Sequence, residues 1–418
     1  MVNQSNIIEN YSQFGIEKGA KLAIAVSGGA DSLALLYLSY RHFDVAVLTV
    51  DHGLRKEARD EARYVASLCE RLGVAHTILT WEGDKPEGNI QAEAREARYA
   101  LMETWCQRHG YPFLAVAHHK DDQAETFLLR LARGSGVYGL SGMKASRQLD
   151  NGVKLIRPLL NYAKAELVDY LNEQKIEWIE DPSNQSEKYG RVKARTMLEN
   201  PPLDGLNTDR LVDTVHRMQQ AQDALSFYEG QWLKAVLSER FGFAFLDLKA
   251  LDTAPDEIVL RGLSRVCMFI GGQIYGPRYE RLCRLKIELG SSDFKGATLS
   301  GAQFVPQKDG KILICREQRQ IETIKPLLPE GNWDNRFSFT AKGDIAGLTI
   351  GKLGEAGLRF LKENHLGFDQ VSVPRQALLA WPAVYRGDNL RLVPELGYDD
   401  LENADIRISL KRNILDKK

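Results

Sequence analysis

Short apolar runs and longer mixed segments alternate along the first ~200 residues. The apolar runs that read as strands are 22–26, 45–50, 74–79 and 113–117. The segments between them that read as helices are 33–38, 55–72, 89–108 and 121–133. Strands that are apolar throughout are buried on both faces, as in a parallel sheet covered by helices on both sides. We therefore predict an α/β fold, in which ligands bind beyond the carboxyl ends of the strands.

The pattern changes near residue 200. Segment 200–207 contains two prolines and a glycine and predicts a linker. Residues 210–236 follow as a long helix, then mixed elements that include a strand at 311–315, and from about 337 a glycine-punctuated α+β segment. This pattern predicts three domains: an α/β domain at 1–205, a mostly helical or mixed middle domain at 206–330 and a small α+β domain at 331–418.

Composition limits the functional classes. The 418 residues have a formal net charge of −1, so any contact with nucleic acid must come from a local basic patch. The five cysteines are scattered without a Cys-x-x-Cys pair, which indicates a reducing compartment and argues against a zinc or iron–sulfur site. We find no signal-peptide pattern and no apolar run of membrane-spanning length, so the sequence predicts a cytoplasmic protein.

The loop after the first strand reads Ser-Gly-Gly-Ala-Asp-Ser, residues 27–32. Two glycines before a helix let backbone N–H groups converge on an anion. Asp31 adds a carboxylate where magnesium accompanies phosphates. An ordinary tight turn with Ser32 as the helix N-cap is the alternative. The loop lacks both the P-loop and the dinucleotide-binding pattern, and it resembles the loop of the N-type ATP pyrophosphatases, which cleave ATP between the α and β phosphates.

The fourth predicted strand runs into His-His-Lys-Asp-Asp-Gln-Ala-Glu, residues 118–125. On a helix, Asp122 and Glu125 share a face, as do Asp121 and Glu125. Paired carboxylates beside an ATP site can bind and orient an amine. A metal site with the two histidines and a solvated helix N-terminus are the alternatives. Adjacent strand residues point to opposite sides, and we favour His118 over His119 as the functional one.

Two further clusters are basic. In segment 89–99, a predicted helix places Gln91, Arg95 and Arg98 on one face. The two arginines could bind a phosphate or a carboxylate. The alternative is that they form salt bridges with neighbouring glutamates on an exposed face. Arg130 and Arg133 end a helix at Gly-Ser-Gly, which is also a favourable helix C-terminus.

Segment 178–184 reads as a strand end entering a turn. Arg191, Lys193 and Arg195 follow it and form the nearest equivalent of a local nucleic-acid patch.

In this order along the chain, the motifs at 27–32, 51–55, 91–99, 118–126, 130–136, 157–160 and 180–184 resemble those of the bacterial tRNA(Ile)-lysidine synthetase family. The resemblance covers most of the first ~195 residues, and 373–398 is similar to that family's C-terminal tRNA-binding region. The resemblance implies a Rossmann-like ATP pyrophosphatase domain. It also implies which residues contact ATP, Mg²⁺, free lysine and the tRNA. The ATP loop is Ser27, Gly28, Gly29, Ala30, Asp31 and Ser32, with Asp51 and His52 lining the nucleotide pocket and Asp31 holding Mg²⁺. Free lysine would contact Arg98, His118, Asp122 and Glu125, and the tRNA would contact Arg130, Arg133, Arg191 and Arg195.

The resemblance also implies a reaction and its catalytic residues. Cytosine O2 of the wobble cytidine in a CAU-anticodon isoleucine tRNA attacks the α-phosphate of ATP, and the lysine ε-amine then displaces AMP to give lysidine. The catalytic set would be Asp31, Asp122, Glu125 and Arg191. One departure is Val192, where the family usually has asparagine.

Other functions compete with this one. A tRNA 2-thiolation enzyme shares the ATP loop but needs paired cysteines, and an amide ligase needs an ammonia source that this chain lacks. A non-catalytic ATP sensor would not need the carboxylates at 31, 122 and 125. The sequence is also compatible with a homodimer.

Overall fold

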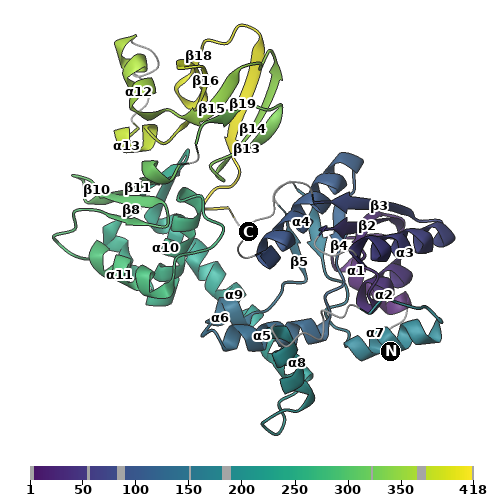
Figure 1. Ribbon diagram of the computed structural model, residues 1–418. Helices are drawn as coiled ribbons and strands as arrows, with labels where there is room; N and C mark the ends of the chain where they lie inside the picture. Colours follow the sequence, from purple (N-terminus) through teal and green to yellow (C-terminus); the bar gives the residue numbers. More distant parts are fainter. Residues whose placement is uncertain are drawn as a thin grey trace. The chain divides into compact units, whose positions relative to one another are not determined.

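The computed structural model describes residues 4–53, 57–81, 90–149, 152–180, 190–321, 323–364 and 373–416. The chain forms two compact units, 1–222 and 223–418 (Figure 1). The division falls inside the long helix α9 (Thr208–Val236), which the sequence predicted at 210–236. The predicted domain boundaries at 205/206 and 330/331 stay predictions.

A six-stranded sheet organises the first unit, in the order β3-β2-β1-β4-β6-β5. The strands are β1 (Lys21–Ala25), β2 (Asp44–Asp51), β3 (Ala75–Thr80), β4 (Phe113–Ala115), β5 (Ser146–Gln148) and β6 (Lys154–Ile156). All neighbours pair in parallel except β5 with β6. The predicted α/β fold with a parallel sheet is thereby confirmed, and an antiparallel strand closes one edge.

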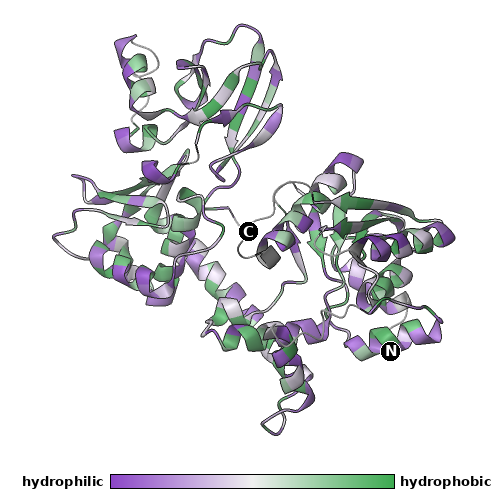
Figure 2. Cartoon of the chain, in the orientation of Figure 1, coloured by the Kyte–Doolittle hydropathy of each residue, from purple (hydrophilic) through white to green (hydrophobic). Residues whose placement is uncertain are grey.

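Helices cover both faces of this sheet because its strands are apolar on both sides (Figure 2). The helices of this unit are α1 (Gln4–Ser12), α2 (Ala30–Ser39), α3 (Glu57–Leu72), α4 (Ile90–His109), α5 (Lys120–Leu131), α6 (Val137–Leu140), α7 (Lys164–Glu173) and α8 (Gly190–Glu199). Leu22 and Ile24 of β1 pack with α1, α2, α3 and α7 in one core. Ala23 between them packs with Met102 and Cys106 of α4 in another. Side chains therefore alternate strictly between an α2 face and an α4 face of the sheet.

Four predicted strands and four predicted helices of this unit match observed elements with small shifts of their ends. Two interpretations need correction. Residues 177–180 have no regular secondary structure, so the predicted strand end at Trp178 is wrong. Helices α1 and α7, which pack against α2, were not predicted from the sequence.

The second unit combines helices with three antiparallel sheets. Their strand orders are β7-β8-β11-β10-β9, β12-β15-β16-β17-β18 and β13-β14-β19. The strands of the first sheet are β7 (Leu237–Arg240), β8 (Phe243–Asp247), β9 (Ala297–Leu299), β10 (Ala302–Pro306) and β11 (Lys311–Arg316). Those of the second are β12 (Lys325–Pro326), β15 (Leu348–Lys352), β16 (Pro382–Arg386), β17 (Asn389–Val393) and β18 (Tyr398–Asp399). Those of the third are β13 (Glu330–Trp333), β14 (Phe337–Gly343) and β19 (Ala404–Leu410), and the helices are α10 (Asp256–Ile270), α11 (Tyr279–Leu289), α12 (Gly354–Glu363) and α13 (Arg375–Leu378). Among the described helices, none is long and apolar enough to cross a membrane.

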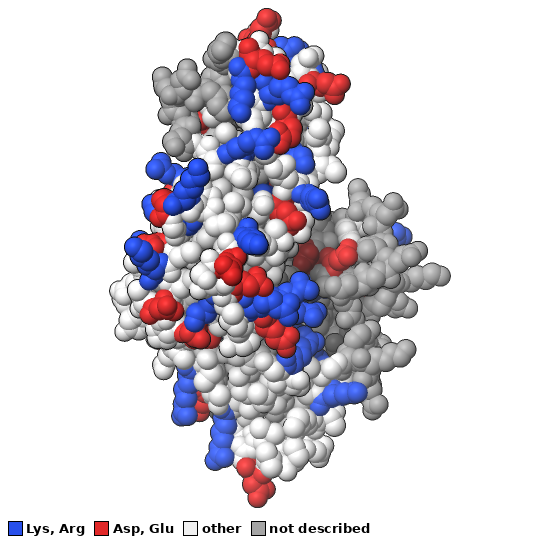
Figure 3. Space-filling view, turned by 90° about the vertical axis from the view of Figure 1, so that its left-hand side faces the viewer, with Lys and Arg blue, Asp and Glu red and all other residues white. Residues whose placement is uncertain are grey.

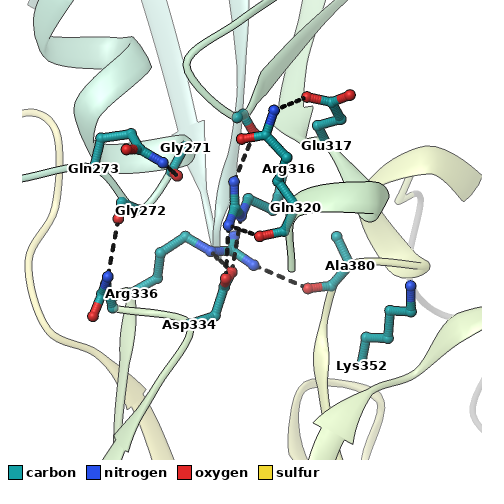
Figure 4. Close-up of polar contacts among 12 residues, drawn as sticks. Gly271, Gly272, Gln273, Arg316, Glu317, Gln320, Asp334, Arg336, Lys352 and Ala380 are labelled. Atoms are coloured by element: carbon teal, nitrogen blue, oxygen red, sulfur yellow. Dashed lines mark hydrogen bonds and ion pairs between the residues drawn. The ribbon is translucent and has the colours of Figure 1, made fainter. Parts of the chain in front are cut away.

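A buried charged network ties these sheets together (Figure 4). Asp334, in the turn between β13 and β14, accepts hydrogen bonds from Arg316 at 3.0 and 2.8 Å and from Arg336 at 2.7 Å. Arg316 also donates to the backbone oxygens of Gly301 and Gln320, and Arg336 to that of Ala380. The three charged side chains are at most 4% exposed.

Candidate functional site

The loop between β1 and α2 adopts a conformation that only glycine takes readily. Gly28 has a φ of +90°, and a Cβ there would lie 3.1 Å from Ile179 Cδ1. The backbone N–H of Ile179 donates to Gly28 O at 2.9 Å, which fixes the loop against a segment 151 residues away in the chain. The loop is therefore held in one shape before any ligand arrives.

Gly29 is the N-cap residue of α2, with extended backbone, and within the described ranges no side-chain hydrogen bond caps the helix. Ser32 lies inside the first turn, where its Oγ accepts from Ser27 N at 3.2 Å and donates to Gly29 O at 2.9 Å. The N-cap residue of α2 is therefore Gly29, so the part of the alternative that made Ser32 the N-cap is wrong. The positive pole of α2 points to this loop, as at anion-binding helix termini.

His119 lies at the centre of the carboxylates near this loop. Its Nε2 is 3.5 Å from Asp31 Oδ2 and 3.7 Å from Asp122 Oδ2, and its Nδ1 is 3.5 Å from Asp121 Oδ2. Burial disfavours the charged ring, but the surrounding carboxylates prevail and raise the pKa of His119 to about 10. The ring is therefore an imidazolium at neutral pH that links the loop to the start of α5.

The predicted site residues did not include His119. The signal was available, because strand alternation places His118 and His119 on opposite faces and sends His119 to the α2 face, where the loop lies. Asp121, on the same face, also accepts a hydrogen bond from the backbone N–H of Lys164 at 2.8 Å, which joins α5 to α7.

Asp31 keeps one oxygen for a ligand. Its Oδ1 is buried and has no hydrogen-bond partner among the described residues, whereas Oδ2 faces His119. Burial acts to raise the pKa of Asp31, but the hydrogen bond and charge of His119 outweigh it and the pKa is lowered. In the described part of the chain no group of three or more His, Cys, Asp or Glu can hold a metal by itself. One carboxylate oxygen beside the predicted phosphate-binding loop nevertheless fits Mg²⁺, which commonly takes its remaining ligands from substrate phosphates and water.

The predicted amine-binding carboxylates are paired with arginines of α8. Arg195 donates from Nε and Nη2 to Glu125 Oε1, at 3.0 and 2.9 Å, and Glu125 is 1% exposed. Glu125 Oε2 is buried, and no described residue donates a hydrogen bond to it. Arg191 Nη1 lies 4.0 Å from Asp122 Oδ1. Thus the structure brings predicted lysine-binding and tRNA-binding residues into direct contact with one another.

Asp51 and His52, at the end of β2, lie at the same edge of the sheet. Asp51 Oδ1 accepts from Gly53 N at 2.7 Å, and Arg59 Nε is 3.9 Å from its other oxygen. His52 Nε2 contacts the guanidinium of Arg98 of α4 at 3.0 and 3.2 Å. The predicted lysine-binding Arg98 therefore touches the predicted nucleotide-binding His52.

His118 lies in a basic environment on the α4 face. Burial and the positive charges of Arg157, Arg95 and Arg191 hold its pKa well below 6.5. The ring is therefore neutral. Acidic side chains therefore surround His119 and basic side chains surround His118, at the same edge of the sheet.

The remaining predicted residues have other surroundings. Arg130 Nη1 donates to the carbonyls of Gly139 and Gly142, at 2.7 and 3.1 Å, and anchors the loop after α5, whereas Arg133 is exposed. The side chain of Gln91 and the segments 54–55 and 181–184 lie outside the described residues. On the face shown in Figure 3, basic and acidic side chains are interspersed, in keeping with the small net charge.

Comparisons with known proteins match this architecture. A PP-loop domain family model matches residues 3–201. The tRNA(Ile)-lysidine synthase of Ruegeria pomeroyi is 37% identical over 92% of this chain and 91% of its own length. That of Wolbachia pipientis is 37% identical over 94% of each. Among solved structures, the U34-tRNA thiolase of Methanococcus maripaludis matches at a TM-score of 0.46 and 18% identity, over 53% of this chain and 78% of its own.

Proposed function

The chain belongs to the tRNA(Ile)-lysidine synthase family, and we propose that it is an ATP-dependent ligase that attaches free lysine to C2 of the wobble cytidine of a CAU-anticodon isoleucine tRNA. The product, lysidine, changes the codon and amino-acid specificity of the tRNA from methionine to isoleucine. The observation that carries the site assignment is the convergence of the loop at 27–32 with Asp31, His119 and Asp122 at one sheet edge. Cytoplasmic location and a homodimer stay predictions from sequence.

The first half-reaction uses the α2 face. The backbone of residues 27–32 and the helix terminus would bind the ATP phosphates, and Asp51 and His52 would line the nucleotide pocket. Cytosine O2 attacks the α-phosphate and pyrophosphate leaves. Asp31 would hold Mg²⁺, which when bound neutralises charge on the phosphates. His119 keeps Asp31 in place and supplies a positive charge from the protein side.

The second half-reaction uses the carboxylates of α5. The ε-amine of lysine attacks C2 of the adenylated base, and AMP leaves. Asp122 and Glu125 would bind the ammonium groups of lysine, taking the place of contacts now made with Arg191 and Arg195. Arg98 and neutral His118 would complete the pocket, and a neutral ring adds no charge that repels the amine. The arginines so released, with Arg130 and Arg133, would contact the tRNA.

The cysteines argue against 2-thiolation as the alternative. Cys69, Cys106, Cys267 and Cys315 are buried in separate parts of the core, and only Cys283 is partly exposed. Burial raises the pKa of the first to about 11 and those of the other three to about 12. Sulfur transfer needs accessible thiolates, and this set provides no such pair.

One assay tests the proposal. Purified protein is incubated with labelled lysine, ATP and an isoleucine tRNA that carries a CAU anticodon, with a CAU methionine tRNA as control. We expect label in the isoleucine tRNA, together with release of AMP and pyrophosphate. No incorporation, or equal incorporation into both tRNAs, would overturn the proposal.

A further inference from the structure

Two arginines meet the ring of a single tyrosine on the α4 face. The guanidinium carbon of Arg95 is 5.3 Å from the ring centroid of Tyr99, and that of Arg147 is 5.2 Å from it. Arg95 and Tyr99 lie one turn apart on α4, whereas Arg147 comes from the edge strand β5. Cation–π contact of this kind orients a guanidinium while leaving its N–H groups free to donate.

Both guanidinium groups are available to a ligand. Arg95 and Arg147 are exposed, and within the described ranges neither forms an ion pair with a carboxylate. The one hydrogen bond that Arg95 forms with a described residue runs from Nη2 to the hydroxyl of Tyr99, at 3.3 Å. Elsewhere in this unit exposed arginines such as Arg63 pair with acids. A pair of oriented, unpaired arginines is the arrangement that binds an anion.

Further positive charge lies behind this pair. Arg157, directly after β6, is 6% exposed and donates from Nη1 to Lys144 O at 2.7 Å, while its buried Nε has no hydrogen-bond partner among the residues that the structure describes. His118 and Arg98 are on the same face of the sheet. Positively charged groups therefore extend from the exposed surface to the edge of the sheet that carries the candidate site. Together they attract an anionic ligand that extends along this surface.

We propose that Arg95 and Arg147, held on Tyr99, bind backbone phosphates of the RNA that enters the site. The inference rests on the proposed function, since it requires a polynucleotide substrate. An exposed surface at the edge of a sheet suits a long ligand that carries a charge at every residue, such as an RNA strand. The carboxylate of free lysine is the competing anion, and it would be expected in an enclosed pocket instead.

The test measures tRNA affinity against salt concentration for Arg95→Gln, Arg147→Gln and the double variant. We expect about a tenfold decrease of tRNA affinity in the double variant. The slope of log K against log salt should fall by about 0.7–0.9 for each phosphate that an arginine no longer neutralises. The KM for lysine and the KM for ATP, measured at saturating tRNA, should not change.

Arg41→Gln is the matched control. Arg41 is exposed and lies 5.4 Å from the ring of Tyr40, but it precedes β2 and so stands at the opposite edge of the sheet. Its removal should leave the affinity and the salt slope unchanged. Tyr99→Phe, which keeps the ring, should retain most of the affinity, and Tyr99→Ala should behave like the double arginine variant.

Three results are separable. Variants that bind tRNA with wild-type affinity and salt slope overturn the inference. A raised lysine KM with unchanged tRNA affinity also overturns it and assigns the pair to the amino-acid carboxylate. A wild-type protein that binds tRNA through these residues but incorporates no lysine leaves the inference standing and contradicts the proposed function.

Discussion

Arg195 donates two hydrogen bonds to one oxygen of Glu125, while the other oxygen of that carboxylate is buried and has no partner in the part of the chain that the structure describes. A guanidinium therefore occupies the position where an amine substrate is expected. Arg195 is 38% exposed, so it can move out to solvent when a second cation arrives. Lysine binding then amounts to an exchange of one cation for another on a buried carboxylate.

If lysine displaces Arg195 from Glu125, substitutions of these two residues should change the KM for lysine in opposite directions. Arg195→Gln removes the competing cation, so the KM for lysine should fall by about fivefold, as expected when a partly exposed ion pair is removed. Glu125→Gln removes the negative charge, and the KM for lysine should rise at least about tenfold. Steady-state kinetics at saturating ATP and tRNA measure both. If both variants raised the lysine KM, the pair would be a structural contact and no exchange would occur.

Gly28 and Gly29 should respond differently to an added side chain. Gly28→Ala places a Cβ at positive φ and 3.1 Å from Ile179, so it should lower the free energy of unfolding by about 1–2 kcal/mol. Gly29→Ser adds a preferred N-cap residue where the nearest atom is 3.7 Å away, and it should be neutral or slightly stabilising. Urea unfolding of both variants measures this. Equal destabilisation would show that space in the loop, and not backbone conformation, sets the need for glycine.

The sequence was sufficient to predict four of the strands in the first sheet and the place of the glycine loop, because these follow from local patterns. Apolar runs set β1, β2, β3 and β4, and the glycine loop follows β1 directly. Contacts between distant segments were not predictable. Arg195 reaches Glu125 across 70 residues, and the packing of α8 against α5, not a spacing rule, brings them together.

His119 shows a different limit. Alternation correctly separated the two histidines, but it does not say which face carries the acids. That depends on the position of Asp31 after β1 and of Asp121 and Asp122 at the start of α5, which only the folded sheet brings together. The prediction that favoured His118 rested on its place at the end of the strand and did not include the charged groups around each ring.

The buried network in the second unit should be sensitive to removal of one charge. Asp334→Asn leaves Arg316 and Arg336 buried without their shared carboxylate, which should cost about 3–5 kcal/mol of unfolding free energy. The backbone should add no strain, because asparagine tolerates the φ of +51° at this position. Asp309→Asn removes the same charge from an exposed loop and should cost less than about 0.5 kcal/mol. Urea unfolding of the full chain compares them, and a cost for Asp334→Asn as small as for the control would contradict the assignment.

The same network predicts an acid dependence of stability. Burial acts to raise the pKa of Asp334, but Arg316 and Arg336 outweigh burial, and the pKa is lowered. Because the pKa is lower in the folded state, the unfolded chain binds more protons. The contribution of ionised Asp334 to the free energy of unfolding is therefore complete above the unfolded pKa of about 3.9. It declines as the pH falls through the folded pKa. The difference in unfolding free energy between wild type and Asp334→Asn should therefore be constant near neutral pH and shrink below about pH 4. A gap for Asp334→Asn that stayed constant across that range would show that the two arginines do not hold this carboxyl ionised.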